Sequence, residues 1–146
     1  MIKSHLAILF FVLTLSACAS SGGGASSHKI TTKTLASSTK MEPSLYFEVN
    51  NFNIKDASVI DQHAKWLKSH PESVMILAGF CDERGNQEFN LELGDRRARA
   101  VMKALMDKGI SEKQLIIVSF GKDRPAYDPT PTSSWSKNRR VDFIIR

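Results

Sequence analysis

Two neighbouring acids, Asp82 and Glu83, are the residues of this chain that come nearest to catalytic chemistry. Adjacent carboxyl groups can divide general acid and general base work between them. A serine or cysteine nucleophile would also need a histidine placed as its base, and the sequence contains no recognisable triad motif. The pattern therefore argues against an enzyme and favours a binding role for this block.

The histidines and cysteines do not form a metal-ligand motif. The histidines are scattered along the chain: His5, His28, His63 and His70. His63 and His70 are seven residues apart and can share a helix face, but no further ligand completes a site. We therefore expect no metal and no cofactor.

Residues 1–17 have the pattern of a secretory signal peptide, with Lys3 followed by apolar residues from Leu6 to Leu15. This apolar stretch is well short of the roughly 20 residues that a membrane-spanning helix needs. Leu15-Ser16-Ala17-Cys18 resembles the lipobox of bacterial lipoproteins, which implies cleavage before Cys18 and modification of its thiol with diacylglycerol, a lipid that carries fatty acids such as palmitate. The alternative is ordinary cleavage that leaves a free Cys18. Ala19, in place of an aspartate, implies an outer-membrane lipoprotein that faces the periplasm.

Residues 18–43 are predicted to be a flexible tether, because Ser, Gly and Thr dominate and Ser20-Ser21-Gly22-Gly23-Gly24 interrupts any regular pattern. With Cys18 acylated, Cys81 has no partner for a disulfide bond. The formal net charge of +5 comes from 20 basic residues mixed with 15 acidic ones. A mixed surface on an exported chain predicts no nucleic-acid partner.

Residues 44–146 alternate between strand and helix patterns. Alternating or continuous apolar runs predict strands, and apolar residues at helical spacing predict helices. The predicted strands are 45–49, 74–80, 115–120 and 141–145, the predicted helices are 56–70 and 87–108, and 121–135 is predicted to be an irregular loop. In the second helix the inward residues are expected to be Phe89, Leu93, Val101 and Leu105.

This order predicts an α/β fold of the α+β sandwich type, with helices packed on one face of a mixed four-stranded sheet. At least one helix is expected to cross over between neighbouring parallel strands.

Several separated blocks resemble the OmpA-like peptidoglycan-binding domain. The blocks are 79–86, 89–91, 93–98, 119–122 and 137–141, with further matches at Tyr46-Phe47 and Pro125. The resemblance covers about residues 44–146 and implies the β-α-β-α-β-β order of that family. Within the family, the chain is most similar to the outer-membrane lipoproteins that work with the Tol system.

The resemblance implies that the domain binds the diaminopimelate residue of the peptidoglycan stem peptide. Asp82 matches the family aspartate that receives the ligand ammonium, and Arg97 matches the arginine whose fork receives the ligand carboxylate. Asn50, Asn90 and Leu91 are weaker candidates for the same site. Alternatively, Asp82 caps its loop or pairs with Arg84, and Arg97 is a surface charge.

Other positions leave alternatives open. Arg96 is adjacent to Arg97 and can exchange roles with it, although alignment on Ala98 favours Arg97. Asn50 can instead be an ordinary turn residue, and Leu91 can simply pack. Gly85 is expected to adopt a backbone conformation that other residues resist. Arg139-Arg140 resembles a basic pair of the family, with solvated charges on an edge strand as the alternative.

Phe80 and Cys81 replace the His and Ala that are usual in these lipoproteins. The bulk of Phe80 is expected to change either the rim of the pocket or the surface that meets the Tol system's propeller protein, TolB. Cys81 is expected to be a small packing residue rather than a redox switch, because no second cysteine is available to resolve it.

The resemblance implies a protein that tethers the outer membrane to the cell wall without covalent bonds, as part of a system for envelope integrity and cell division. The alternative is a lipoprotein that acts mainly as a periplasmic protein-interaction partner without a Tol function.

Overall fold

The computed structural model describes residues 41–146. The predicted signal peptide, the predicted lipidation site Cys18 and most of the predicted tether lie outside the described residues. The first described residues are already bonded to the rest of the domain. The carbonyl of Glu42 accepts a hydrogen bond from the His63 ring, and the carbonyl of Pro43 accepts one from the amide of Phe143. Among residues 41–146, no helix has the length and apolar character needed to cross a membrane.

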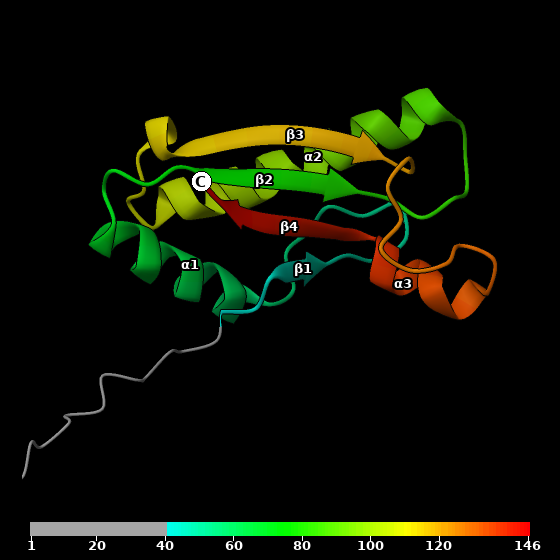
Figure 1. Ribbon diagram of the computed structural model, residues 1–146, viewed down its shortest axis with the longest axis horizontal. Helices are drawn as coiled ribbons and strands as arrows, with labels where there is room; N and C mark the ends of the chain where they lie inside the picture. The colour runs from blue at the N-terminus through cyan, green and yellow to red at the C-terminus, as the bar shows by residue number, and fades with distance from the viewer. Residues whose placement is uncertain (1–40) are drawn as a thin grey trace, which may run out of the picture. The chain divides into compact units, whose positions relative to one another are not determined.

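The described chain forms four strands, two long helices and three short helical segments (Figure 1). The strands are β1 (Ser44–Tyr46), β2 (Met75–Phe80), β3 (Leu115–Gly121) and β4 (Arg140–Ile145). The long helices are α1 (Ala57–Ser69) and α2 (Gln87–Asp107). The short segments are the 3₁₀ turns η1 (Glu112–Gln114) and η2 (Thr132–Ser134) and the helix α3 (Trp135–Asn138).

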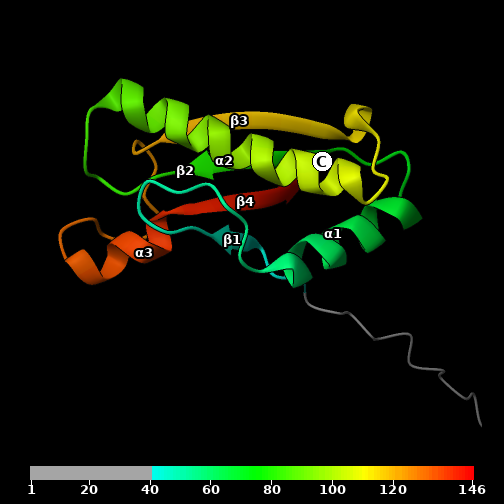
Figure 2. The ribbon, with the colours of Figure 1, turned by 180° about the vertical axis from the view of Figure 1, so that it is seen from behind.

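The strands form one mixed sheet in the order β1-β4-β2-β3. β2 and β3 are parallel and are joined through α2, whereas β4 runs antiparallel to both of its neighbours. Figure 2 shows α1 and α2 in front of the sheet, and Figure 1 shows the opposite face with the strands in front. The predicted fold class and the predicted helical crossover are confirmed.

Both long helices begin where a side chain satisfies the free amides of the first turn. The Asp56 carboxylate accepts from the amide of Ser58, and the Asn86 side chain accepts from the amide of Phe89. The apolar faces of both helices then pack on the sheet, where Leu67, Leu77 and Leu105 are completely buried. The bounds of α1 and α2 differ by at most one residue at each end from the predicted ranges 56–70 and 87–108.

The first half of α2 lies unusually close to β2. A Cβ atom added to Gly79 would stand 2.1 Å from the carbonyl oxygen of Gly94, so neither backbone leaves room for a side chain there. This contact brings the amino-terminal half of α2 against the carboxyl end of β2.

Three sequence predictions are wrong in detail. The first strand ends at Tyr46 rather than Val49, because the chain beyond it leaves the sheet to form a turn in which Asn50 has φ +50°. Phe89 is 45% exposed instead of facing inward. The predicted loop 121–135 contains the end of β3 and the turn η2.

Candidate functional site

A cavity of about 200 Å³ lies at the carboxyl end of β2, between the β2–α2 loop, the first half of α2, the β1–α1 loop and the start of β4. The lining residues are Val49, Asn50, Cys81, Asp82, Arg84, Gly85, Phe89, Asn90, Leu93, Arg97 and Arg139.

Asp82 follows β2 directly and is 6% exposed. Arg84 forks onto its carboxylate, with Nε donating to Oδ1 at 3.1 Å and Nη2 donating to Oδ2 at 2.6 Å. The Arg84 amide also donates to Oδ1, and Arg139 donates from Nη1 to Oδ2 at 3.2 Å. Burial alone would raise the pKa of Asp82, but the hydrogen bonds from Arg84 and Arg139 outweigh it and lower that pKa overall. Asp82 is therefore a charged carboxylate with both oxygens in use.

Arg97 is completely buried beneath the cavity. Nε and Nη2 donate to the carbonyls of Asn51 and Glu48, each at 2.9 Å, and Nη1 donates to the carbonyl of Phe80 at 2.9 Å. These bonds tie α2 to the β1–α1 loop and to the end of β2. Desolvation lowers the pKa of Arg97, although the group titrates far above neutrality and keeps its charge.

Arg139, which directly precedes β4, is bonded both to the residue after β1 and to Asp82. Its Nε donates to the carbonyl of Phe47 at 2.9 Å, and its own backbone carbonyl accepts from the amide of Phe47 at 2.8 Å. Arg139 is 9% exposed, and β4 is an inner strand of the sheet. Arg140, the other member of the basic pair, is 6% exposed. The alternative that Arg139 and Arg140 are solvated charges on an edge strand is therefore wrong.

Positive charges outnumber negative ones in the cavity lining. One carboxylate, Asp82, faces the guanidinium groups of Arg84, Arg97 and Arg139, so the lining residues have a net charge of +2. Groups of both signs therefore lie within one small space, although Asp82 is paired with Arg84 and Arg139 and the donors of Arg97 are bonded to backbone carbonyls. The arrangement suits a small ligand group that carries a carboxylate together with an ammonium.

The structure brings four of the five predicted binding residues together. Asp82, Arg97, Asn50 and Asn90 all line the cavity, whereas Leu91 does not and is 38% exposed. Asn90 is buried, and its side-chain amide donates to the carbonyls of Arg84 and Asn86, which fixes the β2–α2 loop.

The sequence also allowed that Asp82 pairs with Arg84 and that Arg97 is a surface charge, and the structure answers these two points differently. Asp82 does pair with Arg84, as that alternative proposed, but Arg97 is not a surface charge. Its neighbour Arg96 lies on the exposed side of α2, where it pairs with Glu92. The arginine that lines the cavity is thus Arg97. Gly85 has φ +84°, the left-handed conformation that the sequence predicted for it.

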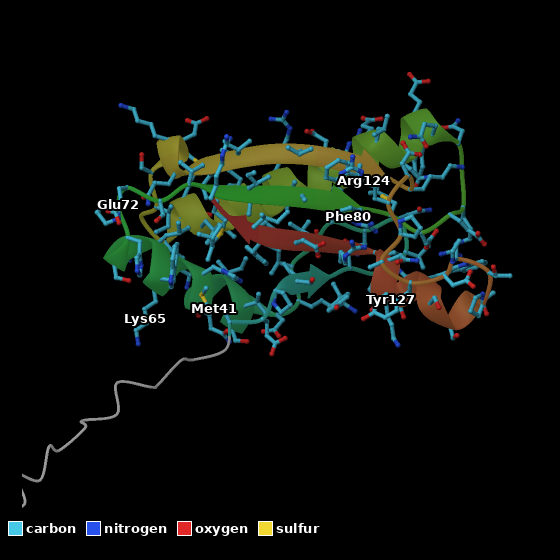
Figure 3. All side chains as sticks on the ribbon, in the orientation of Figure 1. Met41, Lys65, Glu72, Phe80, Arg124 and Tyr127 are labelled. Atoms are coloured by element: carbon cyan, nitrogen blue, oxygen red, sulfur yellow. The ribbon has the colours of Figure 1, made fainter. Side chains whose placement is uncertain are left out.

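The two unusual residues before Asp82 face different environments. Phe80 does not line the cavity; its ring stacks on Phe120 and lies 3.8 Å from the Arg140 guanidinium. In Figure 3, Phe80 and Arg124 are labelled where β2 and β3 end, on the face of the sheet away from α1 and α2. Phe80 is thus absent from the cavity lining and only 5% exposed, so its bulk fills space between β2, β3 and the Arg140 side chain and the expected change of the pocket rim is not seen.

Cys81 is 3% exposed, and its thiol donates to the carbonyl of Asn90 at 3.3 Å. Desolvation by burial raises the pKa of this thiol to about 11. The thiol is therefore protonated at neutral pH and unreactive, in keeping with a packing residue.

Sequence reasoning missed part of the pocket. The sequence names Arg84 only as an alternative partner of Asp82 and not as part of the pocket, does not place Arg139 beside Asp82, and predicts Phe89 in the core. The one available signal was the position of Arg84 two residues after Asp82, which is the spacing of a side chain that folds back onto its own loop. The contact between Arg139 and Asp82 spans 57 residues and leaves no local trace in the sequence.

Comparison with known proteins gives consistent results. The OmpA family profile matches residues 46–139. The chain is 43% identical over 100 residues to the peptidoglycan-associated lipoprotein of Pseudomonas aeruginosa, a match that covers 67% of this chain and 59% of that protein. It is 33% identical to the peptidoglycan-associated lipoprotein of Haemophilus influenzae, and this match covers 89% of each chain.

Solved structures agree with the sequence matches. The crystal structure of the peptidoglycan-associated lipoprotein from Burkholderia pseudomallei superposes with a TM-score of 0.70 at 38% identity, covering 72% of this chain and 91% of that one. The C-terminal domain of Helicobacter pylori MotB superposes with a TM-score of 0.64 at 26% identity, covering 70% of this chain and 83% of that one.

Proposed function

The chain belongs to the OmpA family, and we propose that it is a lipoprotein that binds peptidoglycan without covalent bonds and tethers the outer membrane to the cell wall. The proposed ligand is the diaminopimelate residue of the stem peptide. The side chain of this residue ends in a carbon that carries both an ammonium and a carboxylate.

The observation that carries the proposal is the buried carboxylate of Asp82 among three arginines in a cavity of about 200 Å³. In the proposed complex, Asp82 receives the ligand ammonium, and the guanidinium charges around it, Arg97 at the floor included, attract the ligand carboxylate. Asn50 and Asn90 shape the walls. Leu91 is proposed to contact parts of the peptide outside the cavity.

The test is co-sedimentation of residues 18–146, carrying Cys18→Ser, with sacculi that contain diaminopimelate. Asp82→Asn should weaken binding by about 2–5 kcal/mol, because the ligand ammonium then enters a partly desolvated pocket without a counter-charge. Asp95→Asn is the matched control, since Asp95 pairs with Arg99 on the exposed side of α2 and does not line the cavity. Equal binding by the parent, Asp82→Asn and Asp95→Asn would overturn the site. Absence of binding by the folded parent would overturn the function.

The membrane part of the proposal rests on Cys18. Lipidation there would anchor the chain through several acyl chains, each methylene contributing about 0.8 kcal/mol on burial. Labelling of cells with radioactive palmitate should mark the full chain and not Cys18→Ser. Fractionation should find the labelled protein in the outer membrane, and recovery in the inner membrane would contradict that location.

The resemblance extends the proposal to the Tol-Pal system, with TolB as a partner in envelope integrity and cell division. The alternative is a periplasmic interaction partner without a Tol function. Co-purification of TolB with the chain from its own cells, tested beside sacculus binding, separates these two roles. Wall binding without TolB capture would leave a tether that works outside the Tol system.

A further inference from the structure

Of the three arginines at the cavity, only Arg84 has room to move. Arg97 is 0% exposed and Arg139 is 9% exposed, and each is bonded to backbone carbonyls of other elements. The side chain of Arg84 is 42% exposed, and Asp82 is the one acid with which it forms an ion pair within the described residues. Its other described contact is with Trp135, whose ring centroid lies 4.4 Å from the guanidinium carbon.

Arg84 also occupies the place that a ligand cation needs. Its fork covers Oδ1 and Oδ2 of Asp82, and Arg139 takes a further position on Oδ2. A ligand ammonium therefore cannot pair fully with Asp82 while Arg84 remains in this position. The buried Arg139 cannot give way without also losing the carbonyl of Phe47.

We propose, on the premise of the function proposed above, that Arg84 is an exchangeable partner of Asp82 and that this exchange selects a zwitterionic side chain. The entering ammonium takes the place of the Arg84 guanidinium on Asp82. The released guanidinium stays at the mouth of the cavity beside Trp135 and pairs with the ligand carboxylate.

The selectivity follows from the charges. The lining residues already have a net charge of +2, so a ligand that brings only an ammonium raises the positive charge of the cavity and leaves Arg84 without a partner. A ligand that brings an ammonium and a carboxylate adds no net charge and supplies a new partner for Arg84. Arg84 thereby favours a diaminopimelate stem over a lysine stem, which lacks the carboxylate.

The experiment measures binding of two tripeptides, L-Ala–γ-D-Glu–meso-diaminopimelate and L-Ala–γ-D-Glu–L-Lys, to residues 18–146 carrying Cys18→Ser. Arg84→Gln should reduce the preference for the diaminopimelate peptide by about fivefold, the equivalent of one partly exposed charge pair, in part by tightening the binding of the lysine peptide. Arg84→Lys should retain most of the preference, because the charge that opposes a second ammonium is kept. Arg96→Gln is the control and should leave the preference unchanged, since Arg96 pairs with Glu92 away from the cavity.

The outcomes separate the two proposals. If the parent binds the diaminopimelate peptide and Arg84→Gln leaves the preference unchanged, or weakens both peptides equally, the exchange is wrong while the proposed function stands. If the folded parent binds neither peptide, the function itself fails.

A second measurement follows the movement of Arg84 directly. The chain has two tryptophans, and Trp66 stacks on His70 in α1, outside the cavity lining. In a Trp66→Phe background, binding of the diaminopimelate peptide should change the emission of Trp135, and Arg84→Gln should abolish most of that change. Saturated binding with no change in Trp135 emission would contradict displacement of the guanidinium.

Discussion

The two halves of α2 bury different kinds of side chain. The second half buries Ala98, Val101 and Leu105 against the apolar core, as an amphipathic helix is expected to do. The first half buries Leu93 and Gly94 together with two polar side chains, Asn90 and Arg97, which donate to backbone carbonyls of the β2–α2 loop and of the end of β2. Burial in the second half serves stability alone. In the first half it also fixes the walls of a cavity, so polar burial with defined backbone partners distinguishes the site from the core.

The largest expected effect comes from Arg97→Met, which makes the first half of α2 resemble the second. Removing the guanidinium leaves the carbonyls of Glu48, Asn51 and Phe80 without these donors. Each buried acceptor left unpaired costs about 1–3 kcal/mol, so the free energy of unfolding should fall by about 3 kcal/mol or more. Urea denaturation measures the change. Arg96→Met is the neighbouring control and should cost less than about 0.5 kcal/mol; equal costs for the two would remove the distinction between the two sides of the helix.

Leu105→Ala tests the second half of the helix. Leu105 is completely buried in the core, and its truncation should cost about 2–5 kcal/mol in the free energy of unfolding. Because Leu105 does not line the cavity, the folded variant should keep the parent's affinity for sacculi. An affinity that falls together with stability would mean that the core and the cavity are coupled.

The helix caps give a smaller contrast between the same two regions. Asn86→Ala and Asp56→Ala each remove a side-chain acceptor at a helix N-terminus and should each cost about 1 kcal/mol in urea denaturation. Only Asn86 adjoins the β2–α2 loop, where its carbonyl also accepts from Asn90. Asn86→Ala should therefore weaken sacculus binding and Asp56→Ala should not. Equal binding by both variants would show that the loop holds its shape without the cap.

The smallest expected effect is a loss of stability on acidification, and it comes from His63, a buried polar residue of α1. Desolvation lowers the pKa of His63, and its Nδ1 has no hydrogen-bond partner. The unfolded chain therefore binds a proton that the folded chain resists, so stability falls as the pH drops below about 6.5 toward the lower pKa of the folded state. His63→Phe, which can keep the stacking on Phe143, should flatten this limb in urea titrations between pH 7 and pH 5.

Asp82 contributes in a different pH range. Its lowered pKa means that its stabilising ion pairs persist above about pH 4 and are lost as the pH falls through the folded-state pKa. A parent curve that is flat between pH 7 and pH 5 would contradict the role given to His63 without affecting Asp82.

Much of the fold follows from local signals in the sequence. Pro71 closes the first helix pattern, the apolar run at 74–80 marks the buried strand β2, and Asn86 marks the start of α2. These features depend on spacing and capping within a few residues, so one sequence is enough to find them. The short β1 was overestimated because its apolar pattern continues past Tyr46, where the chain turns away to meet Arg97.

The site could be predicted only in part. Asp82, Arg97, Asn50 and Asn90 were assigned from the resemblance, and the structure brings them to one cavity. The role of Arg139 depends on a contact that crosses from the last strand to the β2–α2 loop, and the exposure of Phe89 depends on how far α2 extends past the sheet. Both are set by tertiary geometry, which periodicity does not encode.

The short strand β1 has a mechanical consequence. It lies between the start of the domain and the cavity wall at Val49 and Asn50, and it pairs with β4 through three residues. A pull applied at Met41 is met first by the bonds to the carbonyls of Glu42 and Pro43, and then by β1. The backbone at Val49 and Asn50 is pulled out of place only after these contacts rupture in turn. Residues 42–46 therefore protect the shape of the cavity wall against a pull at the start of the domain.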